Sequence, residues 1–213
     1  MSSRRVTEAE RQAKLAAVRA EQSRKQRRRT VLIASVAGVL VLALVGVAAA
    51  VIIGEGRQQA ALEAAADADI EGVETFEDLT FNHVTTTVDY PQAPPVGGDH
   101  NAAWLNCGVY AETVPDENAV HSLEHGAVWL AYDPSLPADE VDRLEALAEG
   151  NAYVLVSPYE GMDAPVVATS WGYRLALESA DDERLPVFVE KYLLNPELSE
   201  VGAPCSNGVG TPA

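Results

Sequence analysis

One segment near the start of the chain is apolar throughout, whereas apolar and polar residues are mixed everywhere else. Residues 31–53 are 23 consecutive residues in which Ser35 is the only polar side chain. At about 1.5 Å per residue this segment reaches ~34 Å as a helix, enough to span the ~30 Å hydrocarbon core of a bilayer. We therefore predict a transmembrane helix over residues 30–54.

The charges on the two sides of this segment differ in sign and predict its orientation. Residues 1–29 contain ten Arg or Lys against three Glu, whereas residues 55–213 contain five Arg or Lys against 29 Asp or Glu. Basic flanks stay on the cytoplasmic side, so residues 1–29 are predicted to be a cytoplasmic tail and the rest to lie outside. A signal peptide cleaved near residues 48–50 is the alternative, but its apolar core would normally be only about 7–15 residues long.

The acidic part of the chain is predicted to form a stalk and one domain. Residues 55–69 are rich in Ala, Gln and Glu and favour a helical stalk, and residues 70–213 are long enough for one extracytoplasmic domain. The negative charge argues against nucleic acid as a partner, because its phosphates would be repelled. The expected partners are the lipid bilayer and other envelope proteins.

Within the outer domain, the spacing of apolar residues predicts a mixture of strands and helices. The predicted strands cover residues 83–90, 127–132, 152–156 and 166–177, and the predicted helices cover residues 137–149 and 184–194. This pattern favours an α+β fold with a small mixed sheet and two packed helices, preceded by the transmembrane helix and the stalk. The pattern leaves the strand order open.

The two cysteines, Cys107 and Cys205, both fall in the outer domain. An even number of cysteines outside the cytoplasm favours a disulfide between them. Such a bond would join the tail of the domain to its first half. The alternative is a pair of thiolate metal ligands, which would need a reducing environment or early metal loading.

All four histidines fall within residues 83–125, where they are the clearest indication of chemistry in the chain. His121 and His125 are four residues apart, so one helical turn would place both imidazoles on the same face. Such pairs are typical of zinc and copper sites, and His100, which follows a Gly-Gly turn, is predicted to supply a third nitrogen. His83 falls on the polar face of its predicted strand and is expected to be exposed.

Two neighbouring features admit other interpretations. His121, Glu124 and His125 fit the H-x-x-E-H pattern of inverted zinc peptidases, in which the glutamate is the general base. Gly126 and the apolar run after it leave little helix to hold that motif. Met162 offers a thioether that would suit copper, although a lone methionine usually fills a core. The three tryptophans are expected to be core residues as well.

Four stretches together resemble a known family: YPQAPPVGGDHNAAWLNCGVY, NAVHSLEHGAVWLAYDP, YVLVSPYEGMDAPVVATSWG and GAPCSNGVG. They are similar to the bacterial domain of unknown function 3105, over about residues 70–210. The resemblance implies a membrane-anchored protein of an actinobacterial type and carries no established activity. It also implies that several candidate residues lie in the family's recognisable blocks, namely His100, Cys107, His121, Glu124, His125, Trp171 and Cys205.

We therefore predict a membrane-anchored outer domain that binds a transition metal, copper or zinc, through His100, His121 and His125. No reaction is needed to account for such a site, so an enzyme is not the first expectation. The alternative from another class is a non-catalytic interaction module of an envelope complex, in which the histidines only brace loops. A zinc-dependent hydrolase that uses the H-x-x-E-H stretch is a third interpretation.

Overall fold

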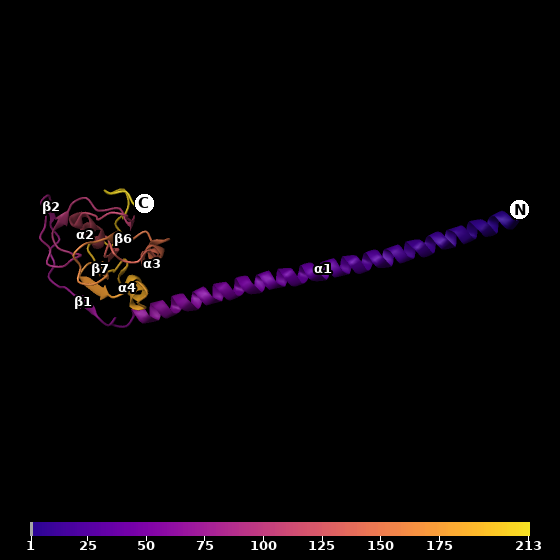
Figure 1. Ribbon diagram of the computed structural model, residues 1–213, viewed down its shortest axis with the longest axis horizontal. Coiled ribbons are helices and arrows are strands. Elements are labelled where there is room, and N and C mark those ends of the chain that lie inside the picture. The colour runs from indigo at the N-terminus through magenta and orange to yellow at the C-terminus, as the bar shows by residue number, and fades with distance from the viewer. Residues whose placement is uncertain (1) are drawn as a thin grey trace. The chain divides into compact units, whose positions relative to one another are not determined.

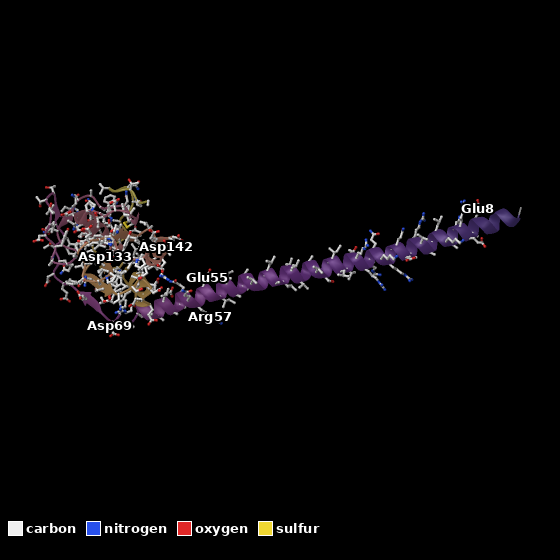
Figure 2. All side chains as sticks on the ribbon, in the orientation of Figure 1. Glu8, Glu55, Arg57, Asp69, Asp133 and Asp142 are labelled. Carbon is white, nitrogen blue, oxygen red and sulfur yellow. A yellow bond between two sulfur atoms is a disulfide. The ribbon has the colours of Figure 1, made fainter. Side chains whose placement is uncertain are left out.

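A single helix, α1 (Ser2–Ala66), contains the whole uncharged segment in the computed structural model, which describes residues 2–213 (Figure 1). An 18-residue window within Glu8–Ala66 has a mean hydropathy of 3.0, so α1 is long and apolar enough to cross a membrane by length and composition. Glu55 and Arg57 follow the uncharged segment on the same helix (Figure 2). The predicted tail, span and stalk are therefore parts of one helix, which ends three residues before the predicted end of the stalk.

The remaining elements belong to the compact unit Gln59–Ala213, which is built on a mixed six-stranded sheet. Its strand order is β1-β8-β7-β5-β6-β4, and β2 and β3 form a separate two-stranded sheet. The strands are β1 (Val73–Thr75), β2 (His83–Val84), β3 (His100–Asn101), β4 (Gly108–Val109), β5 (Val128–Tyr132), β6 (Val154–Pro158), β7 (Val166–Ser170) and β8 (Tyr173–Leu177). The helices of this unit are α2 (Asp116–Glu124), α3 (Ala138–Ala148) and α4 (Arg184–Tyr192). The predicted α+β class is confirmed, and the unit has one helix more than the two predicted.

One face of the six-stranded sheet packs against α3 and α4. Alternate residues of β5, Val128 and Leu130, form one fully buried cluster with Leu144 of α3 and Phe188 of α4. β5 and β6 are parallel, and α3 is the crossover helix that a parallel pair requires. This face therefore contains the larger part of the hydrophobic core.

The opposite face of the sheet packs against α2 and irregular segments. Trp129 and Ala131 point to this face from β5, because successive side chains of a strand point to opposite sides. They form a second buried cluster with Leu123 of α2, and with Leu105 and Cys205 from the loops. Residues from the middle and the end of the domain thus share this face, which also carries the histidines.

Two of the predicted strands were wrong in extent. Of the predicted strand 83–90, only His83–Val84 forms a ladder, because its parallel partner β3 is itself only two residues long. Further along, the backbone N–H of Val88 donates to the Glu117 carboxylate at 2.9 Å instead of to a neighbouring strand. Residues 166–177 form the β7–β8 hairpin and not a single strand, with Gly172 at a φ of +80° between the two strands.

The predicted disulfide between Cys107 and Cys205 is present. The two residues are separated by 98 positions in the sequence, and their Cα atoms lie 5.3 Å apart, within the usual range for this bond. The bond joins the tail of the domain to the segment just before β4. The alternative role of the cysteines as thiolate ligands is therefore wrong for this oxidised state.

The packing of α3 leads to a stability prediction. Leu144→Ala is expected to lower the free energy of unfolding by about 2–5 kcal/mol, because it leaves a cavity in the larger core cluster. Asp142→Ala, an exposed change on the same helix, should alter it by no more than about 0.5 kcal/mol. Urea unfolding of the full chain in detergent micelles, followed by tryptophan fluorescence, measures both. Equal effects would contradict the place of Leu144 in the core.

Candidate metal centre

Helix α2 carries the central residues of the candidate site, and the sequence explains where it begins and ends. It follows Pro115 and has two acidic residues in its first turn, which complement the positive end of the helix. At its other end, the N–H of Gly126 donates to Leu123 O at 2.9 Å and that of Ala127 donates to Ser122 O at 3.0 Å. This bond pair is a Schellman motif, with Gly126 at a φ of +100°. Gly126 therefore ends the helix directly after His125.

All four histidines meet at this helix. The ring centroid of His121 lies 4.8 Å from that of His83, 4.8 Å from that of His100 and 4.6 Å from that of His125. Parallel pairing of β2 with β3 places His83 directly opposite His100. The cluster thus combines two short strands with the last turn of α2, and His121 lies at its centre.

Backbone carbonyl groups fix the orientation of three of these rings. The Nδ1 atom of His100 lies 2.8 Å from Gly98 O, that of His121 lies 2.7 Å from Asn101 O, and that of His125 lies 2.9 Å from Pro204 O. A carbonyl oxygen can only accept, so each Nδ1 must carry the proton and donate it. In the neutral ring, the lone pair is then on Nε2, which leaves that atom free to bind a cation.

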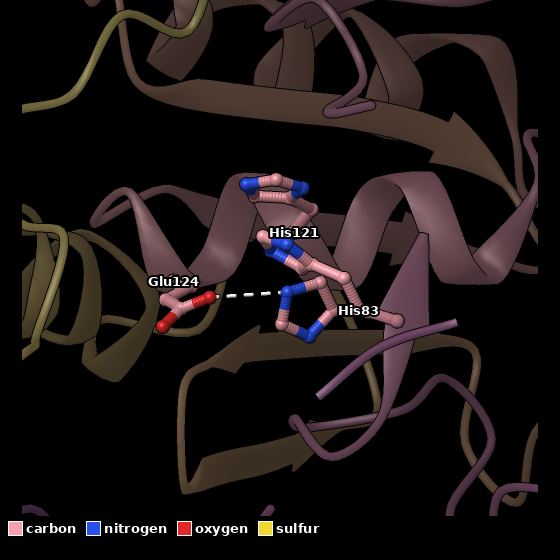
Figure 3. A group of neighbouring side chains, drawn as sticks. His83, His121 and Glu124 are labelled. Carbon is pink, nitrogen blue, oxygen red and sulfur yellow. Dashed lines mark ion pairs between the residues drawn. The ribbon is translucent and has the colours of Figure 1, made fainter. Parts of the chain in front are cut away.

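Each of these Nε2 atoms faces a carboxylate. His100 Nε2 lies 3.0 Å from Glu124 Oε2, while His125 and His121 Nε2 lie 3.3 and 3.7 Å from Glu200 Oε2. Figure 3 shows His83, His121 and Glu124, with a dashed line for the ion pair of Glu124. Among the residues that the structure describes, none hydrogen-bonds to the buried Nε2 of His100. Two acceptors at such distances repel each other unless a cation, either a proton or a metal ion, lies between them.

The ligand atoms fall into two groups that share His121. One group contains His83, His100, His121 and Glu124, and the other contains His121, His125 and Glu200. Within each group, one ligand atom per residue lies within 4.8 Å of the others. The predicted trio is therefore divided: His121 belongs to both groups, whereas His100 and His125 belong to different ones.

The electrostatics of the cluster favour a cation. Glu124 is only 4% exposed, and among the side chains of residues 8–213 neither Glu124 nor Glu200 forms an ion pair with Lys or Arg. Burial, reinforced by the neighbouring imidazoles, lowers the pKa of His121 against the opposing effect of its bond to Asn101. The His121 ring is thus neutral at pH 7 and its lone pair is available. A neutral ring with a free lone pair beside two carboxyl groups is an environment suited to a divalent ion.

The other residues considered from the sequence lie outside the ligand groups. Trp104 is half-buried, with its ring centroid 5.2 Å from that of His125, whereas Trp129 and Trp171 are buried in the core, as expected. Met162 packs against the second core cluster and lines a surface depression beside α3.

Glu124, which the H-x-x-E-H pattern would make a general base, belongs to the first ligand group. Its carboxylate faces His100 with one oxygen and accepts a hydrogen bond from Ser199 Oγ at 2.6 Å with the other. That arrangement fits a ligand better than a general base.

The family comparison agrees with the resemblance inferred from the sequence. A family model described as "Protein of unknown function (DUF3105)" matches residues 83–207, more than half of the chain. The chain belongs to the DUF3105 family. No curated protein and no solved structure gives a match. All six candidate ligands of this DUF3105 domain lie inside the matched segment, from His83 in β2 to Glu200.

Three candidate ligands of the DUF3105 domain were missed by sequence reasoning. His83 was expected to be exposed, and it is. Its ring also stacks on that of His121 at an interplanar angle of 28°, which the sequence did not indicate. Glu124 was considered only as a general base. Glu200 belongs to an acidic tail without periodicity, so no local pattern distinguished it. The clustering of all histidines within 83–125 was the one signal that included His83.

The helix terminus before β5 gives a second stability prediction. In Gly126→Ala the new Cβ would lie 2.9 Å from Leu194 Cα, so the backbone has to shift in addition to the unfavourable φ. Gly150→Ala is the matched control, since its φ is +76° and nothing lies within 4 Å of its Cβ. Gly126→Ala should lower the free energy of unfolding by about 1–3 kcal/mol more than Gly150→Ala does. Urea unfolding measures the difference, and an equal loss would contradict the close contact.

Proposed function

We propose that this DUF3105 domain binds one divalent transition-metal ion, copper or zinc, at the group of His83, His100, His121 and Glu124. The observation that carries the proposal is the pairing of buried Nε2 lone pairs with carboxylate oxygens, described above for His100 and Glu124. Two atoms bound to the same tetrahedral ion at ~2.0–2.1 Å lie about 3.3 Å apart. Within this group, His100 Nε2 and Glu124 Oε2 lie 3.0 Å apart, close to this value.

The choice of this group over its neighbour follows from the number and burial of the ligands. The first group offers four ligands, the coordination number of most structural zinc sites, and three of its four residues are buried. The second group, with His125 and Glu200, offers three ligands. His121 has a single free nitrogen, because its Nδ1 is bonded to Asn101 O, so an ion bound to His121 occupies one group at a time. His125 is then a neighbour of the ion and not its ligand.

The ligand chemistry restricts the metal. Imidazole and carboxylate donors suit zinc and copper(II), and the cysteine sulfurs are held in the disulfide, so no thiolate favours a soft monovalent ion. In direct competition the general order of affinities favours copper, whereas a four-coordinate set with three histidines and one carboxylate suits zinc. A role in holding or handling the metal requires no reaction at the site.

Metal content tests this proposal on the full chain, purified in detergent from an oxidising compartment. The parent, offered copper or zinc and then dialysed, should retain one equivalent per chain by mass spectrometry. His121→Ala and His100→Ala should each retain less than about a tenth of that, since each removes one of the buried nitrogen ligands and weakens chelation. His125→Ala should retain more of the ion than either of these variants, because His125 belongs only to the second group.

The controls separate loss of the site from loss of the fold. Glu145→Gln removes a carboxylate of α3, which packs on the face of the sheet opposite α2, and belongs to neither ligand group, so the metal content should not change. Circular dichroism must show the same fold for every variant. A folded, disulfide-bonded parent that retains no metal would exclude the proposal and favour the non-catalytic interaction module of an envelope complex.

We also propose that α1 anchors the domain in the membrane with the basic tail in the cytoplasm. The support is the apolar length of α1 and the excess of Arg and Lys before it. After expression in bacteria, the protein should remain in the membrane pellet during extraction at alkaline pH. External protease added to spheroplasts should remove an epitope at the C-terminus and spare one at the N-terminus. Release of the domain into the soluble fraction would instead indicate cleavage near residues 48–50.

A further inference from the structure

An irregular segment near the end of the chain touches both candidate ligand groups. Residues 199–205, which we name the strap, contain no helix or strand. Ser199 Oγ donates a 2.6 Å hydrogen bond to Glu124 Oε1, and Glu200 faces His121 and His125. The oxygen of Glu124 that faces His100 is therefore oriented by a residue 75 positions further along the chain.

His125 holds the strap through both its ring and its backbone. Its Nδ1 donates to Pro204 O at 2.9 Å, and its carbonyl oxygen accepts from the N–H of Gly202 at 3.0 Å. The phenol of Tyr153 adds a hydrogen bond to Gly202 O at 3.1 Å. The strap is thus fastened to the residue that ends α2, one residue after Glu124.

A covalent bond fixes the far end of the strap. Cys205 follows Pro204 directly, forms the disulfide with Cys107, and accepts a 2.8 Å hydrogen bond from the N–H of Cys107 at its carbonyl oxygen. Cys205 is 5% exposed and packs in the second core cluster. When this bond is closed, the strap has little freedom to leave the ligands.

We infer that the strap, fastened by the Cys107–Cys205 disulfide, is the positioning element of the metal site, so that metal affinity depends on a closed disulfide. This inference rests on the proposed function. Groups that orient metal ligands through hydrogen bonds typically change metal affinity by about 10–100-fold when removed. Coupling of two equilibria is reciprocal, so a bound ion must also protect the disulfide from reduction by the same factor.

The first test changes one hydrogen bond and leaves the disulfide intact. Ser199→Ala removes the donor to Glu124, and zinc affinity of the full chain in detergent, measured by competition with a chelating dye, should fall at least about tenfold. Ser206→Ala is the matched control, because its exposed side chain lies beyond Cys205 and touches no candidate ligand. It should bind zinc as the parent does.

The second test opens the disulfide. Cys107→Ser/Cys205→Ser should bind zinc at least about tenfold more weakly than the parent. In the parent, saturating zinc should shift the equilibrium between the disulfide and a glutathione redox buffer, followed by thiol labelling, to correspondingly more reducing conditions. The His121→Ala variant should lose this protection while retaining the disulfide, a result that a merely structural disulfide would not give.

The outcomes distinguish the two proposals. Unchanged zinc affinity in both Ser199→Ala and the double-serine variant, with zinc bound by the parent, overturns the positioning role and leaves the proposed function intact. A parent that binds no zinc or copper overturns the proposed function and this inference with it. If the double-serine variant unfolds, the positioning role is tested in the disulfide-bonded protein, by the zinc affinity of Ser199→Ala and by the protection of the parent's disulfide.

Discussion

The histidine cluster depends on three backbone carbonyl groups that accept the Nδ1 protons of His100, His121 and His125. By fixing which nitrogen carries the proton, these bonds direct every free Nε2 toward a carboxylate. The carbonyls come from three separate places: the Gly98 turn, β3 and the strap. The site therefore requires that β3 and the tail both lie beside α2. Pairing with β2 helps to hold β3 there, and the disulfide holds the tail.

Burial makes the carboxylate at the centre of this arrangement energetically unfavourable unless it is compensated. A buried carboxylate such as Glu124 is unfavourable unless a positive charge or hydrogen-bond donors compensate it, and Ser199 satisfies only one of its oxygens. Protonation of His100 is one means of compensation, and a metal ion is the other. The second suits the rest of the domain: residues 55–213 carry 24 more acidic than basic side chains, and their field concentrates cations at the surface.

The parts of the structure predictable from the sequence are those with local periodicity. α3, α4 and β5 follow from apolar spacing, and the His121–His125 pair follows from the helical repeat, although α2 was not predicted as a whole. What could not be predicted depends on long-range contacts. β2 and β3 have two residues each, too few for any period, yet they bring His83 to His100. Glu200 reaches the cluster only because the tail of the domain folds back onto α2. The even number of cysteines predicted that the tail would fold back, but not that Glu200 would then face the histidines.

The disulfide brings the strap back to the segment that contains the candidate ligands. In the chain-entropy model, a disulfide that closes a loop of about a hundred residues lowers the conformational entropy of the unfolded chain and so stabilises the folded state by roughly 4.7 kcal/mol. The proposed ligands lie between His83 and Glu124, and the strap, at the other end of the disulfide-closed interval, reaches them through the hydrogen bond from Ser199 to Glu124. Once the covalent bond has closed that interval, bringing the strap to Glu124 requires little further loss of freedom. With the disulfide closed, the proposed site would be preorganised, whereas a reduced chain would have to order the tail each time an ion bound.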